Sequence, residues 1–139
     1  MKLIVDTNVL FSFFKSDSAT RKVISDISLK LFAPKETFTE LQKYKEEICN
    51  KSKINEKQFK KTIKIISSLI EIIPKSIFIK YYEESKDFLH DDAKDDAPFV
   101  GLALYLGIPL WSNVKALKKQ GKVKVFSTYE LVKILDIKE

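Results

Sequence analysis

The sequence predicts an α/β fold in which helices cover both faces of a parallel sheet. Residues 2–5, KLIV, form a short apolar run that ends at the polar residues DTN, as a buried parallel strand does at its carboxyl end. Further short apolar runs alternate along the chain with helix-like stretches. Residues 95–107 have an interior that is apolar almost all round, which is expected of a helix buried against such a sheet.

The composition fits one globular domain over residues 1–139, with 45% hydrophobic and 32% charged residues. Cys49 is the only cysteine, so no disulfide can form within the chain. The net charge of +6 and the pI of 9.2 permit an anionic partner such as RNA or DNA without requiring one. No signal peptide and no apolar run of about 18 residues is visible, so we expect a cytoplasmic protein with no membrane partner.

In the first half, caps and prolines mark the boundaries between the expected elements. Ser18 and Asn55 are good helix N-caps. A helix is expected to begin just after Pro34, and another is expected to stop at Pro74. The expected elements are a helix at 8–15, a turn at 15–18, a helix at 19–28, a strand at 29–34, a helix at 35–51 and a helix at 55–73.

In the second half, residues 75–80, KSIFIK, fit either a short strand or an extended link. The other expected elements are a helix at 81–89, the buried helix ending at Gly107, strands at 108–112 and 122–126, a short helix near 114–119 and a last helix at 128–135. Strands that alternate with helices in this way indicate a parallel sheet.

The first candidate for chemistry is Asp6, because function in an open parallel sheet concentrates just beyond the carboxyl ends of the strands. An aspartate at such a boundary is also a common helix cap. The following Thr7 or Asn8 could cap the helix instead, and Asp6 would then be free to point into the crevice beyond the ends of the strands.

Two more carboxylates lie in helices near the same edge of the sheet. Glu40 falls just outside the apolar stripe of its helix, but Glu36 and Glu47 lie at similar angles, so helical geometry does not choose among them. Asp96 opens the buried helix, where the helix dipole also favours an acid. Its neighbour Asp95 is expected to be a cap.

Three carboxylates from separate segments would repel one another unless a cation joined them. Mg²⁺ or Mn²⁺ prefers oxygen ligands, and on a basic protein such an ion indicates phosphodiester chemistry. The residue pattern therefore predicts a metal-dependent phosphodiesterase with Asp6, Asp96 and one glutamate of the helix at 35–51 as candidate ligands.

These residues also carry a family resemblance over essentially the whole chain. LIVDTNVLFSFF at the start, a glutamate in the helix after the second strand, and DDAPFVGLALYLGIPLWSN resemble PIN-domain ribonucleases, in particular the group with the toxins of VapBC-type toxin–antitoxin pairs. The resemblance implies a Rossmann-like three-layer α/β/α sandwich and Mg²⁺- or Mn²⁺-dependent cleavage of single-stranded RNA. It selects Asp6, Glu40 and Asp96 as catalytic and metal-binding acids, with Thr7 or Asn8 in support.

The sequence departs from the family at the fourth acid, where LWSNV places Val114 instead of an aspartate. Valine cannot coordinate a metal, so Ser112, Asn113 or Asp92 would fill the gap through water. The alternative is a PIN domain that has lost catalysis and acts as an RNA-binding or protein-interaction module. A haloacid-dehalogenase-type phosphatase would need a second aspartate at the position of Asn8, and no receiver-domain acid pair is evident.

The remaining expectations concern partners. Lys115, Lys118 and Lys119 are candidate contacts for RNA phosphates, although isolated lysines are more often solvated. The aromatic first two helices offer apolar surface that belongs either to the core or to a groove for an antitoxin or a second copy of the chain. The resemblance makes an antitoxin partner and a homodimer plausible.

Overall fold

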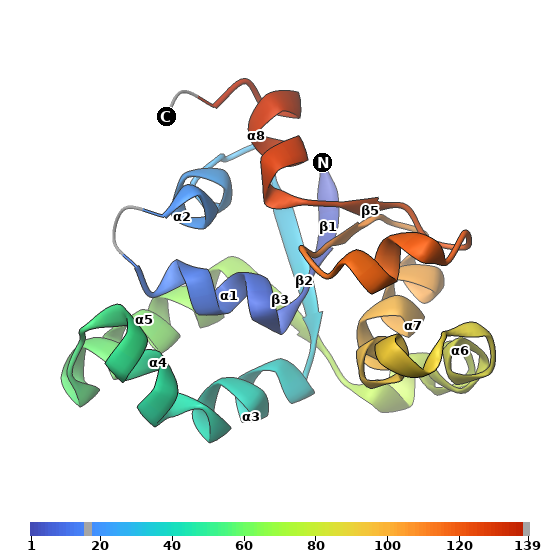
Figure 1. Cartoon of the computed structure of the whole chain (residues 1–139), viewed down its shortest axis with the longest axis horizontal. Coiled ribbons are helices and arrows are strands. Elements are labelled where there is room, and N and C mark those ends of the chain that lie inside the picture. The colour runs from blue at the N-terminus through green and yellow to red at the C-terminus, as the bar shows by residue number, and fades with distance from the viewer. Residues whose placement is uncertain (16–17, 138–139) are drawn as a thin grey trace.

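A computed structural model describes residues 1–15 and 18–137 (Figure 1). Five strands form one parallel sheet in the order β3-β2-β1-β4-β5. The strands are β1 (Lys2–Val5), β2 (Lys30–Pro34), β3 (Ile70–Ile73), β4 (Leu110–Trp111) and β5 (Val125–Phe126). The chain builds outward from β1 on one side and then on the other, so the strand order reverses beside β1. Ligands of open α/β sheets bind at such a switch point, beyond the carboxyl ends of the strands.

Side chains alternate along the strands and divide the core into two clusters. In β1, Leu3 and Val5 belong to one cluster while Ile4 belongs to the other. In β4, Trp111 belongs to the first of these clusters and Leu110 to the second. Because successive strand residues point to opposite faces, both faces of the sheet are covered. The predicted three-layer α/β/α sandwich is confirmed.

The first helical layer is rich in aromatic side chains. It consists of α1 (Thr7–Phe13), α2 (Ala19–Ile24), α3 (Glu36–Lys43), α4 (Lys45–Ser52), α5 (Glu56–Leu69) and α8 (Thr128–Ile134). Phe14 and Phe59 stack at its centre with ring centroids 5.1 Å apart and planes 12° apart. We call this group the aromatic layer.

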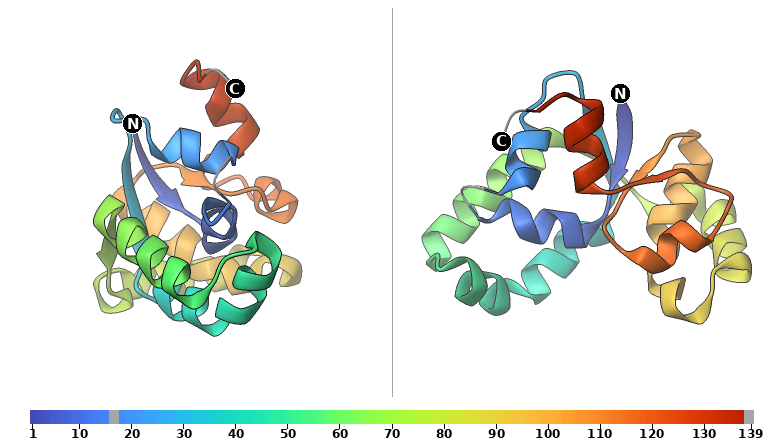
Figure 2. Two further views of the ribbon diagram at one scale, coloured as in Figure 1. Left: turned by 90° about the vertical axis from the view of Figure 1, so that its left-hand side faces the viewer. Right: turned by 45° about the horizontal axis from the view of Figure 1, so that its top comes forward.

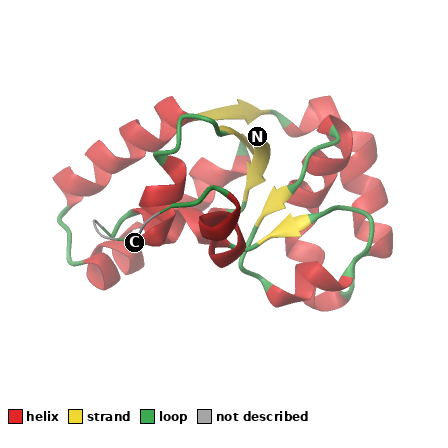
Figure 3. Ribbon diagram, turned by 90° about the horizontal axis from the view of Figure 1, so that it is seen from above, coloured by secondary structure: helices red, strands yellow, loops and turns green. Residues whose placement is uncertain are grey.

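The second helical layer is built around a close helix crossing, shown to the right in the second view of Figure 2. It consists of α6 (Lys75–Phe88), the 3₁₀ turn η1 (Asp91–Asp96), α7 (Ala97–Leu106) and the 3₁₀ turn η2 (Lys115–Lys119). A Cβ on Gly101 of α7 would come within 2.8 Å of the backbone of Tyr82 in α6. We call this group the small-residue layer. Figure 3 shows the strands between the two layers.

Two element predictions between residues 70 and 80 are wrong. The helix expected through Ile73 ends at Leu69, and Ile70–Ile73 is the edge strand β3, paired with β2. Its isoleucines are β-branched and suit a pleated strand once a neighbouring strand is present. Residues 75–80 are neither strand nor link, because α6 begins at Lys75 directly after Pro74.

Other boundaries differ by smaller amounts. The helix expected at 35–51 breaks at Tyr44, whose φ of −100° and ψ of 18° separate α3 from α4. The strands β4 and β5 and the helix α2 are shorter than predicted. The turn predicted at 15–18 lies partly outside the described residues. Over residues 1–15 and 18–137, no helix has both the length and the apolar character needed to cross a bilayer.

Candidate functional site

Asp6 leaves the end of β1 beside Ser112, which follows β4. The register pairs Val5 with Trp111, so the next residue of each strand emerges at the same place. Ser112 Oγ donates a hydrogen bond of 2.7 Å to Asp6 Oδ2, and both side chains are buried. The backbone N–H of Asn8 donates to Asp6 Oδ1 at 3.3 Å. The expectation that Thr7 and Asn8 would relieve Asp6 of capping is therefore wrong, because Asp6 caps α1 itself.

Burial raises the pKa of Asp6, although the hydrogen bonds from Ser112, Asn8 and Thr7 act in the opposite direction. An ordinary helix cap is exposed to water and keeps a low pKa. A carboxylate that is both buried and held by donors is costly to ionise and is positioned with little freedom. These properties suit a site that a cation completes.

Glu40 reaches the same place from α3. Thr7 Oγ1 lies 3.4 Å from Glu40 Oε1 and 3.5 Å from Oγ1 of the fully buried Thr37. Both contacts are long, and one hydroxyl proton serves only one of them at a time. Partial burial and then the charge of Asp6 raise the pKa of Glu40, with a smaller contribution from Glu36.

Thr37 is a buried polar residue of the site that the sequence analysis missed. It lies three residues before Glu40 on α3, so the two share a helix face. That spacing is the sequence signal that would have found it. Its burial at 0% exposure could not have been read from the sequence, since threonine is usually exposed.

Asp96 stands at the beginning of α7 but makes no side-chain capping bond. Burial, followed by the charges of Asp6, Asp95 and Glu40, raises its pKa to about 7. An acid stabilised by a helix dipole would show a lowered pKa. Burial, reinforced by the charges of Asp6, Asp95 and Glu40, therefore outweighs any effect of the helix dipole on Asp96.

Asp6, Glu40 and Asp96 thus come from three elements and repel one another at one edge of the sheet. We call them the acid cluster. Their oxygens suit a hard divalent cation, and a cation would relieve the repulsion. Among the described residues, however, no three Asp, Glu, His or Cys side chains lie close enough to ligate one ion. A cation at the acid cluster would therefore bind part of it through its own waters, as Mg²⁺ often does.

The residues around position 114 differ in what they contact. Val114 donates its backbone N–H to Ser112 Oγ at 3.1 Å, and its side chain packs against the core. Asn113 is turned away, because both ends of its amide bond Thr128: Oδ1 accepts at 2.8 Å and Nδ2 donates at 3.1 Å. Of these residues, Ser112 contacts Asp6, while Asn113 holds the start of α8.

The lysines predicted to bind RNA are exposed, but two of them have acidic partners. Lys118 pairs with Glu130, and Lys119 lies 4.0 Å from Asp92. Asp92 is therefore engaged on the surface of η1. Lys115 is exposed at the start of η2, beside Val114.

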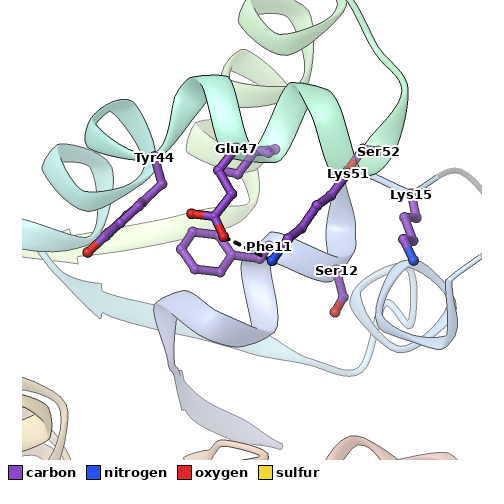
Figure 4. A pocket seen from close by; sticks show the side chains of 8 residues that line it. Phe11, Ser12, Lys15, Tyr44, Glu47, Lys51 and Ser52 are labelled. Atoms are coloured by element: carbon purple, nitrogen blue, oxygen red, sulfur yellow. Dashed lines mark ion pairs between the residues drawn. The ribbon is translucent and has the colours of Figure 1, made fainter.

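A pocket of the described chain lies away from the acid cluster, between α1 and α4 (Figure 4). It has a volume of about 360 Å³ and contains Phe11 and Tyr44, whose ring centroids are 5.9 Å apart. Glu47 and Lys51, one turn apart on α4, form an ion pair of 2.9 Å along its wall. It is a partly apolar surface of the aromatic layer and contains no residue of the acid cluster.

Comparisons with known proteins identify the fold independently. The sequence model of a family described as PIN domain matches residues 4–134. The chain is similar in structure to VapBC2 from Rickettsia felis, solved bound to a DNA fragment from the promoter of its own genes, with a TM-score of 0.69 and 18% identity. That match covers 91% of this chain and 98% of the other. No curated protein sequence matches the chain.

Proposed function

The chain belongs to the PIN-domain family, and from this premise we propose that it is a divalent-metal-dependent endoribonuclease that cleaves single-stranded RNA. The observation that carries the proposal is the acid cluster. Asp6, Glu40 and Asp96 come from both helical layers and from β1, and they influence one another's protonation at the carboxyl edge of the sheet. The acid cluster suits a cation, and the net charge of +6 on the rest of the protein suits an anionic substrate.

The residues of the acid cluster have distinct roles in this proposal. Asp6, fixed by Ser112 and Asn8, would hold the cation together with Glu40 and Asp96. When bound, Mg²⁺ or Mn²⁺ supplies a polarised water and offsets the charge that grows on phosphate oxygens. Asp96, whose pKa is raised to about 7 in the metal-free chain, would contribute a third carboxylate, and a bound cation would favour its ionised form.

The second candidate function is a non-catalytic PIN domain that binds RNA or protein. Val114 favours it, because the side chain at this position is apolar and packs into the core. A role as the toxin of a toxin–antitoxin pair, an antitoxin partner, a homodimer and a cytoplasmic location stay predictions. The VapBC2 structure supports the toxin–antitoxin role through its fold.

A cleavage assay on single-stranded RNA with Mn²⁺ or Mg²⁺ tests the proposal. We expect the parent chain to cleave and Asp6→Asn to lower the rate by about 100-fold, equivalent to about 2.7 kcal/mol of transition-state stabilisation. Glu47→Gln, outside the acid cluster, is the matched control and should keep the parent rate. If Asp6→Asn cleaves as fast as the parent, the site assignment is wrong.

Val114→Asp separates the two candidate functions. Restoring the fourth acid should raise the cleavage rate of an active parent. If cleavage is absent from the parent and occurs only in Val114→Asp, the chain itself is the non-catalytic form.

A further inference from the structure

The pocket between α1 and α4 begins one helical turn from the acid cluster. Thr7 Oγ1 of α1 lies 3.4 Å from Glu40 Oε1 of α3. Four residues further along each helix, the rings of Phe11 and Tyr44 meet edge to face and line the pocket. Since α1 and α3 run side by side in the same direction (Figure 1), the two contacts follow one another along one path.

Phe11 and Tyr44 give the near end of the pocket a partly exposed aromatic surface (Figure 4). Tyr44 stays 38% exposed although its ring packs on that of Phe11. Bases of a single strand stack on such aromatic side chains with little preference for sequence. The acid of this pocket, Glu47, lies further along on α4 and is paired with Lys51, so it is not part of the aromatic surface.

A second pocket continues the first beyond the end of α1. Ser52 lines both pockets, so the two are adjacent. The second has a volume of about 490 Å³, and the charged residues among its described lining are all basic: Arg21, Lys53 and Lys61. We call it the basic pocket. Three cations without an acid beside them suit the phosphates of a nucleic acid strand.

Arg21 is held at the basic pocket by the end of α1. Its Nε donates to the backbone oxygen of Phe13, and its guanidinium carbon lies 5.0 Å from the centroid of the Phe13 ring. The contact with the backbone uses Nε, whereas the fork of terminal nitrogens is the part of a guanidinium that best fits phosphate oxygens. A guanidinium fixed in this way loses less freedom when it binds.

We propose that the RNA substrate extends from the acid cluster along α1, with a base stacked on Phe11 and Tyr44 and a phosphate in the basic pocket. The inference rests on the proposed function, because it places the same single-stranded substrate. The seven residues of α1 span about 10 Å, so the basic pocket receives a phosphate other than the one that is cleaved. An acidic peptide would suit the cations alone, but an aromatic surface followed by a basic pocket matches the alternation of base and phosphate.

Fluorescence anisotropy with a labelled single-stranded RNA of about 12 nucleotides, in EDTA to prevent cleavage, tests the aromatic surface. Tyr44→Leu removes the ring and should weaken binding by about fivefold or more. Tyr44→Phe keeps the ring and should bind like the parent. Tyr105→Leu on α7 is the matched control, because Tyr105 is also exposed and lies 5.9 Å from another ring, that of Tyr81. Equal affinities of Tyr44→Leu and Tyr105→Leu overturn the inference.

The salt dependence of the same binding tests the basic pocket. Lys61→Gln should lower the slope of log affinity against log salt concentration by about 0.7, which is the value for one lost phosphate contact on a single strand. Lys80→Gln, at an exposed position of α6, is the matched control and should keep the parent slope. An unchanged slope in Lys61→Gln overturns the inference. If the pockets instead bind an acidic peptide, Tyr44→Leu and Lys61→Gln both bind RNA like the parent.

Cleavage by the same variants distinguishes failure of this inference from failure of the proposed function. If the parent cleaves RNA while Tyr44→Leu and Lys61→Gln keep full RNA affinity, only the path along α1 is wrong. If both variants weaken RNA binding but the parent cleaves nothing with Mn²⁺, the path holds and the proposed catalysis fails. If the parent binds no single-stranded RNA, both fail.

Discussion

The two helical layers cover the same sheet with different kinds of packing. In the aromatic layer, large rings such as Phe14 and Phe59 fill the space between helices and strands. In the small-residue layer, Ala97 and Ala103 are buried small residues of α7, and Gly101 lets α7 approach α6 so closely that a Cβ there would lie 2.8 Å from the backbone of Tyr82. Large side chains contribute burial, whereas small ones determine how closely two backbones come together.

The difference matters because each layer contributes one acid. Glu40 comes from α3 in the aromatic layer, and Asp96 comes from the start of α7 in the small-residue layer. Asp6 lies between them at the end of β1. We infer that the aromatic layer mainly supplies stability, whereas the close crossing of α6 and α7 determines where Asp96 lies.

The largest expected effect comes from Phe59→Ala in the aromatic layer. Phe59 is completely buried and stacks on Phe14, so its truncation should lower the free energy of unfolding by about 4 kcal/mol. Urea denaturation measures this change. Below the unfolding transition, Mn²⁺ affinity per folded molecule should be unchanged; a parallel loss of affinity would contradict the division between the layers.

A somewhat smaller loss of stability is expected from Gly101→Val in the small-residue layer. The new side chain would meet the backbone of Tyr82, and such overpacking costs up to about 3 kcal/mol. Here Mn²⁺ affinity and cleavage should also fall, by about 10- to 100-fold, because α7 must move and Asp96 with it.

Gly121→Val is the matched control for Gly101→Val. Nothing lies within 4 Å of a Cβ at Gly121, so the free energy of unfolding should change by no more than about 0.5 kcal/mol. If Gly101→Val destabilises the protein but keeps full Mn²⁺ affinity, the crossing of α6 and α7 does not position Asp96.

The smallest expected effect is the pH dependence that Asp96 confers on stability. Its pKa is raised from 3.8 to about 7 in the folded chain, so the folded state binds the proton more tightly than the unfolded state. Without divalent ions, the free energy of unfolding should therefore fall as pH rises from about 4 to about 7. Thermal unfolding across this range measures the effect.

Asp96→Asn should make that fall shallower and stabilise the metal-free chain at pH 8 by about 1 kcal/mol, allowing for solvent screening at a half-buried position. Burial also raises the pKa values of Asp6 and Glu40, so part of the pH dependence should persist. If the free energy of unfolding depends on pH in Asp96→Asn as it does in the parent, the pKa of Asp96 is not raised by burial and the neighbouring acids.

Local patterns predicted most of the fold and pointed to Asp6 and Asp96, whereas the family resemblance selected Glu40 from its neighbours. The apolar run before Asp6 and the apolar interior of the helix after Asp96 are properties of short segments, which the sequence displays directly. The pattern failed at Ile70–Ile73, where the residues IEII continue a helical stretch without a glycine or proline between them. Whether such a run pairs as a strand depends on an available edge, here that of β2.

The sequence by itself determined the layered α/β architecture, the family, and Asp6, Glu40 and Asp96 as the candidate acids. Only the tertiary structure showed that Asp6 is held by Ser112 and that Thr37 is buried one turn before Glu40. The physical reason is range. Periodicity and capping depend on residues within a few positions of one another, whereas the burial and charge of a side chain depend on segments that meet only when the sheet assembles.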